Sequence, residues 1–218
     1  MLVNVLVYWH QFTLGTGRAG LIFVFEHGFV PARFAVEPLA AAGTLVTHAF
    51  LHANALHLLG NMVFLIVFGD NIEDRMGHWR FLGFYLAGAV VAALAQAVLG
   101  GDPRTPLIGA SGAISAVLGA YMRIFPSQRV QAFIPVLLGP WLVMRFFSRQ
   151  PKWFAPWLPA WAFLGYWVLV QAAEALTAEA GSGDGVAWWA HLGGFAFGAL
   201  VANKLAHRER RANETYFG

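Results

Sequence analysis

The sequence contains no cysteine, which excludes disulfide bonds, thiolate nucleophiles and cysteine-ligated metal sites. It is also poor in charge: Asp, Glu, Lys and Arg make up only 11% of its 218 residues, against about 25% in a soluble domain. Hydrophobic residues account for 58%. So little polar surface cannot cover a water-soluble fold, and the composition predicts an integral membrane protein.

The apolar residues form continuous runs rather than the alternation of a membrane β-barrel, which favours helices. Since one helical span takes about 20 apolar residues, the chain has room for about six spans in a single domain, residues 1–218. No linker or internal repeat marks a second domain. We expect an all-α, polytopic bundle with helices near 1–14, 54–72, 80–99, 110–125, 157–177 and 186–205.

Basic residues lie just beyond the apolar runs, where they orient the spans and do not indicate nucleic-acid binding. By this bias Arg123, Arg129 and the tail at 206–218 should be cytoplasmic. With six spans, both termini are then cytoplasmic. Residues 15–50 become a long external connection that associates with the membrane.

Residues 130–147 are apolar enough to span, but Pro135 and Pro140 interrupt any helix there. Crossing the bilayer would also place the basic flanks of this segment on opposite sides. We therefore expect a re-entrant or interfacial segment with both ends inside.

Four polar residues fall at a similar depth in three of the expected helices. His57 and Asn61 lie in the second, Ser111 begins the fourth, and His191 lies near the outer start of the sixth. Polar side chains inside a bilayer face the protein interior or a water-filled cavity. Their shared depth predicts a site near the outer surface.

Small residues indicate how two of these helices meet. Ser111 and Ser115 lie four residues apart on one face, and His191, Gly194 and Gly198 form a stripe on another. Such stripes let membrane helices approach closely, although they also occur as plain packing faces. Docking through them would bring the Ser111 hydroxyl to the His191 imidazole.

A serine beside a histidine is an activated nucleophile, because the imidazole takes the hydroxyl proton. Gly109 and Gly112 around Ser111 permit a sharp turn, and free N–H groups at the helix start can bind an oxyanion. His57 and Asn61, four residues apart, can add donors, or Asn61 can serve only in packing. No acidic residue is placed to complete a triad, so we predict a dyad.

His48 and His52 raise the alternative of a metal site, since two histidines on one helical turn can bind zinc. No HExxH pattern is present and no carboxylate lies nearby. We expect no metal, and a structural role for both residues.

Three segments together resemble the rhomboid intramembrane serine proteases: FLHANALHLLGNM (50–62), GASG (109–112) and AHLGGFAFG (190–198). The resemblance covers five of the six expected helices in order. It includes an ExR element formed by Glu73 and Arg75.

The resemblance implies a serine endopeptidase that cleaves transmembrane protein substrates in or near the lipid bilayer, without a cofactor or metal. It implies that Ser111 is the nucleophile and His191 the general base. It further implies an oxyanion hole made by His57, Asn61 and the backbone at Ser111 and Ala110. His52 would be structural, and Gly194 and Gly198 would form a close-packed helix face.

Two positions depart from the family pattern. Ser115 stands where some members have an aromatic residue that stacks on the histidine, so His191 must be oriented otherwise, for example by Ser115 itself. Gly43 and Thr44 stand where the family has a Trp–Arg pair.

Two rival hypotheses remain at this point. One is a catalytically inactive relative that binds membrane clients, and the other is a histidine-lined metal or transport protein. The expected location is a multi-pass plasma membrane, in a prokaryote.

Overall fold

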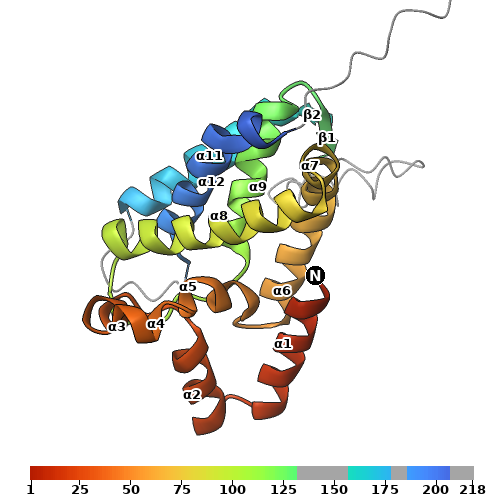
Figure 1. Cartoon of the computed structure of the whole chain (residues 1–218). Coiled ribbons are helices and arrows are strands. Elements are labelled where there is room, and N and C mark those ends of the chain that lie inside the picture. Colours follow the sequence, from red (N-terminus) through yellow and green to blue (C-terminus); the bar gives the residue numbers. More distant parts are fainter. Residues whose placement is uncertain (132–156, 178–185, 207–218) are drawn as a thin grey trace, which may run out of the picture.

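The computed structural model describes residues 1–131, 157–177 and 186–206, and these are mostly helical. The expected segment at 130–147 and the tail at 206–218 fall almost entirely outside the described residues. Figure 1 shows a bundle of long helices with several short helices gathered at one end.

The expected external connection at 15–50 contains a series of short helices. It follows α1 (Leu2–Leu14) and comprises α2 (Arg18–His27), α3 (Pro31–Val36), α4 (Pro38–Ala41), α5 (Thr44–Thr47) and the 3₁₀ turn η1 (His48–Phe50). Pro31 and Pro38 each stand at the start of a helix, where the missing N–H costs nothing. In Figure 1 these elements lie at the end of the bundle where α9 begins.

The second expected helix is longer than predicted. It consists of α6 (Ala55–Phe64), the π-helical turn η2 (Leu65–Gly69) and α7 (Asp70–Met76), and it ends at Gly77, which has φ 79°. The expectation of an end near residue 72 is therefore corrected, because the polar residues Asp70–Met76 continue the helix. Arg75, in the last turn of this continuous helix, matches the negative end of the helix dipole.

Two helices in the described part are long and apolar enough to cross a membrane: Ala55–Met76 and α8 (His78–Leu99). The remaining long helices are α9 (Ser111–Ile124), α11 (Ala160–Thr177) and α12 (Trp188–Leu205). Each of these begins within three residues of its expected start.

The expectation of an all-helical chain needs one small correction. Strands β1 (Arg129–Gln131) and β2 (Trp157–Pro159) pair antiparallel, with Val130 opposite Leu158. The expected helix at 157–177 therefore begins only at Ala160, after the strand.

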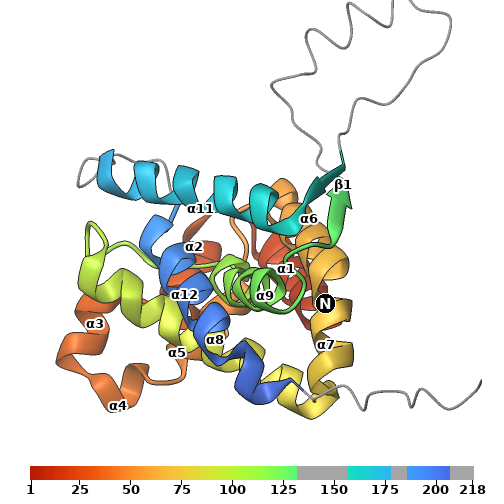
Figure 2. The ribbon, with the colours of Figure 1, turned by 90° about the horizontal axis from the view of Figure 1, so that it is seen from above.

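Helix α9 lies at the centre of the molecule. Figure 2 shows it surrounded by α6 and α7, α8, α12 and α11, and it contacts each of these helices. Its residues from Gly112 to Tyr121 are all buried. A helix enclosed in this way can be as short as 14 residues, because other helices rather than lipid cover it.

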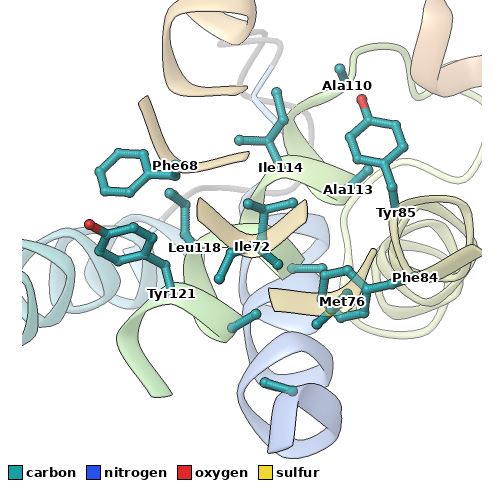
Figure 3. Close-up of a cluster of buried hydrophobic side chains, with 14 of the residues drawn as sticks. Phe68, Ile72, Met76, Phe84, Tyr85, Ala110, Ala113, Ile114, Leu118 and Tyr121 are labelled. Carbon is teal, nitrogen blue, oxygen red and sulfur yellow. The ribbon is translucent and has the colours of Figure 1, made fainter. Parts of the chain in front are cut away.

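The apolar core lies between α9 and its neighbours. Figure 3 shows side chains of η2, α7 and α8 meeting those of α9, and Ile72, Met76, Phe84 and Leu118 all belong to this one cluster of buried residues. Tyr121 meets Phe68 edge-on at a ring-centroid distance of 4.9 Å. This packing fixes the position of α9, and therefore of the serine at its first residue.

Candidate active site

Ser111 is the first residue of α9, and the turn before it has a backbone shape that requires glycine. Gly109 has φ 118°, and a Cβ there would lie 2.8 Å from Cε1 of His57. Its N–H donates to the carbonyl of His48 at 2.9 Å. Ala110, which caps the helix, is fully buried. The turn therefore holds the half-buried Ser111 hydroxyl beside the free N–H groups of a helix start.

The structure brings Ser111 and His191 together. Nε2 of His191, in the first turn of α12, lies 2.8 Å from Oγ of Ser111. This is a normal hydrogen-bond length for a pair of this kind. The two residues are 80 positions apart in the chain, so their contact depends entirely on how α9 and α12 pack.

Glycines on α12 allow that packing. A Cβ on Gly194 would lie 2.2 Å from the carbonyl oxygen of Gly112, and one on Gly198 would lie 1.8 Å from that of Ala116. Both distances are far below any real Cβ contact. The backbones of the two helices therefore touch along this stripe, at the positions expected from the sequence.

His57 projects from α6 toward the same region, and Asn61 lies one turn later on the same face of α6. Asn54 caps α6 by accepting from the backbone N–H of His57 at 2.9 Å. The His57 ring lies against Gly109, and the ring of His52 meets it edge-on at 5.2 Å. Asn61 is 7% exposed. Its side-chain Nδ2 is buried and makes no hydrogen bond within the part of the chain that the structure describes.

Ser115 does not orient the histidine, contrary to the suggestion from the sequence. Its hydroxyl donates to the carbonyl of Ser111 at 2.7 Å, one turn back along α9. Both nitrogens of the His191 ring have other partners.

The sequence reasoning missed one residue of this site. Oε1 of Gln171, on α11, lies 2.6 Å from Nδ1 of His191. Gln171 is only 6% exposed. A third member of the site was expected only among acidic residues, and glutamine is neutral. The available signal was a lone amide within the apolar run WVLVQAAEAL, because polar residues in membrane helices are costly and tend to be functional.

His48 and His52 are buried and lie outside the long helices. The His48 ring N–H donates to the carbonyl of Ala89 at 3.4 Å, and the backbone N–H of His52 donates to Oε1 of Gln11 at 3.0 Å. Burial lowers the pKa of each ring to about 4, and for His52 the nearby His57 adds to the effect. Both rings are therefore neutral near pH 7.

The structure is thus a helical bundle in which a serine and a histidine, at the starts of two packed helices, are hydrogen-bonded to each other. The chain belongs to the rhomboid family, since the model of the Rhomboid domain matches residues 41–208. The resemblance seen in the three sequence segments is thereby confirmed, and the chain is a membrane protein.

Similar proteins come from several kingdoms. The chain is 34% identical over 121 residues to RHOMBOID-like protein 12, mitochondrial, of Arabidopsis thaliana, covering 46% of this chain and 36% of that protein. It is 32% identical over 91 residues to mouse Rhomboid-related protein 2, covering 42% and 30%. It is 36% identical over 85 residues to Rhomboid protease GluP of Bacillus subtilis, covering 39% and 16%.

The matches thus span about a third or less of the length of these relatives. One of these relatives is named as mitochondrial, and another comes from a bacterium. The expected prokaryotic plasma membrane has no support from them.

Proposed function

We propose that this protein is an intramembrane serine endopeptidase that cleaves transmembrane segments of other membrane proteins. The observation that carries the proposal is the 2.8 Å contact between Oγ of Ser111 and Nε2 of His191. Membership of a family that includes a protein named as a protease, GluP, supports it.

The proposed reaction begins at Ser111. Its oxygen attacks the scissile carbonyl while Nε2 of His191 takes the hydroxyl proton. The resulting oxyanion receives hydrogen bonds from the backbone N–H groups at Ala110 and Ser111 and from the side chains of His57 and Asn61. The buried, unpaired Nδ2 of Asn61 suits this role, because a donor left without a partner in the resting protein is ready for a ligand.

Collapse of the intermediate breaks the peptide bond. His191 gives its proton to the leaving amine, and an ester joins Ser111 to the amino-terminal part of the substrate. Water then attacks this ester, with His191 again taking the proton, and the serine is released. No step requires a metal or cofactor.

The proposed membrane arrangement has six spans with both termini on the cytoplasmic side. The connection at 15–50 then lies at the external surface, and 130–147 is re-entrant or interfacial. Gathering of α2–α5 at the end where α9 begins supports a site near that surface, which water can reach.

A fluorophosphonate probe tests this function, because it reacts with activated serines. We expect the purified wild-type protein to be labelled and to cleave a transmembrane substrate. Ser111→Ala and His191→Ala should each abolish both activities while the protein stays folded. Ser115→Ala is the matched control, since its hydroxyl bonds only the backbone of the same helix, and it should remain labelled.

An unlabelled wild-type protein that still binds membrane clients would favour the inactive-relative hypothesis. Stoichiometric zinc or another metal in the purified protein would favour the metal or transport hypothesis. Labelling that persists in Ser111→Ala would show that another residue is the nucleophile.

A further inference from the structure

The imidazole of His191 is held on several sides by α11 and α12. The ring of Trp167, on α11, lies 6.0 Å from it at an interplanar angle of 36°, and the ring of Trp188 meets it nearly at right angles at 6.1 Å. Gln171 follows Trp167 by four residues, so both side chains leave the same face of α11. This face supplies a ring contact and a hydrogen bond to the same imidazole.

We propose that Gln171 is a positioning residue of the active site, whose Oε1 accepts Nδ1–H of His191 and so selects the tautomer with a free Nε2. The inference rests on the function proposed above. It extends the site from a pair to a serine–histidine–glutamine row, linking α9, α12 and α11 through contacts of 2.8 and 2.6 Å.

The chemistry of the two atoms determines where the proton lies. An amide oxygen only accepts hydrogen bonds, so a 2.6 Å contact places the proton on Nδ1. A neutral imidazole carries one N–H, and Nε2 is therefore left with its lone pair facing Ser111. The opposite tautomer would present N–H to the serine and could not take its proton.

A neutral partner also fits the surroundings. A carboxylate in this position would have to be desolvated in the apolar interior of a membrane protein, which is unfavourable even when it is paired. The amide of Gln171 offers an oxygen of the same reach without a charge. Its dipole still points its negative end at the ring when His191 carries the serine proton.

The test compares three variants. Gln171→Leu removes the acceptor while keeping an apolar side chain in an apolar helix. Gln171→Glu keeps an acceptor oxygen at the same reach, whether or not the carboxyl is ionised. Gln96→Leu is the matched control, because Oε1 of Gln96 accepts from the backbone N–H of Ala190, next to His191, without touching the imidazole.

Two measurements separate positioning from simple structural support. The first is kcat and KM for cleavage of a transmembrane substrate, together with the rate of fluorophosphonate labelling. The second is ¹⁵N NMR of histidine-labelled protein in detergent, which reads the tautomer directly. The His191 signal is identified by its loss in His191→Asn.

We expect the proton of wild-type His191 on Nδ1. Gln171→Leu should lower kcat and the labelling rate roughly 10–100-fold, as loss of one buried hydrogen bond does, with little change in KM. Gln171→Glu should restore most of the rate and keep the Nδ1 proton, and Gln96→Leu should resemble the wild type.

The proposal is overturned if wild-type His191 carries its proton on Nε2, or if Gln171→Leu keeps the wild-type kcat. It is also overturned if Gln96→Leu loses as much activity as Gln171→Leu, since the effect would then be general support of α12. A wild-type protein without Ser111-dependent labelling would instead refute the proposed function. The tautomer measurement does not need activity, so the two failures are distinguishable.

Discussion

Gly194→Ala tests whether backbone contact between α9 and α12 sets the geometry of the active site. The new Cβ would lie 2.2 Å from the carbonyl oxygen of Gly112, the residue after the proposed nucleophile. Real Cβ atoms almost never come closer than 3.0 Å. Moving this contact from 2.2 to 3.0 Å requires the two helices to part by about 0.8 Å.

That displacement is large for the catalytic pair, because His191 lies one turn before Gly194. Parting along the Ser111–His191 hydrogen bond would lengthen it from 2.8 Å to about 3.6 Å, a separation at which no hydrogen bond remains. A misplacement of about 1 Å commonly costs ~10²-fold in rate. We therefore expect Gly194→Ala to lower fluorophosphonate labelling of Ser111 by about that factor, and to lower the Tm in detergent.

Gly165→Ala is the matched control. Gly165 also lies inside a helix, α11, but a Cβ there would meet nothing within 4 Å. This variant should label at the wild-type rate and be as stable as the wild type or slightly more so, because alanine favours a helix over glycine by up to about 1 kcal/mol. Wild-type labelling and an unchanged Tm in Gly194→Ala would refute the reasoning.

Two further predictions concern Asn61 and His48. Asn61→Ala should lower kcat roughly 10–1000-fold, the usual cost of one oxyanion donor, and a wild-type cleavage rate would remove Asn61 from the oxyanion hole. Burial lowers the pKa of His48 to about 4 from 6.5 when unfolded, so its contribution to stability is complete above pH 6.5 and is lost as the pH falls toward 4. The free energy of unfolding should therefore fall by about 3 kcal/mol over this range. His48→Gln should have a lower Tm at pH 7, but its free energy of unfolding should depend less steeply on pH. An equally steep pH dependence in the variant would show that His48 is not the group responsible.

The contact between Ser111 and His191 could be predicted because it depends on simple repeats. Residues three or four positions apart share a helix face, and small residues on a face show where a neighbouring helix can approach. Gly194 and Gly198 lie on the α12 side of that interface, and Ser115 lies on the α9 side. These rules use only spacing and size, which the sequence displays directly.

The role of Gln171 could not be predicted in the same way. Its place in an apolar run was visible, but the sequence does not show which face of α11 turns toward His191. That orientation depends on how α11 packs beside α9 and α12, after a strand that was not expected. The position of Gln171 within α11 therefore did not show that its partner is His191.

The π-helical turn at Leu65–Gly69 was also not predictable. Its residues, LIVFG, are those of an ordinary apolar helix, and the extra residue per turn is a property of the backbone. The end of this helix was also misplaced. The polar residues of α7 were expected to end it, although they continue it as far as Met76.

The pairing of Phe29 with Leu107 has a consequence for shortening this protein. Phe29 is fully buried, and the two residues exchange backbone hydrogen bonds of 3.0 and 2.8 Å just ahead of the turn at Gly109. The family match begins only at residue 41. A chain trimmed to that boundary would keep every proposed catalytic group and yet lose one of the contacts that hold the loop before Ser111. We therefore expect the smallest unit with the proposed activity to begin before residue 41.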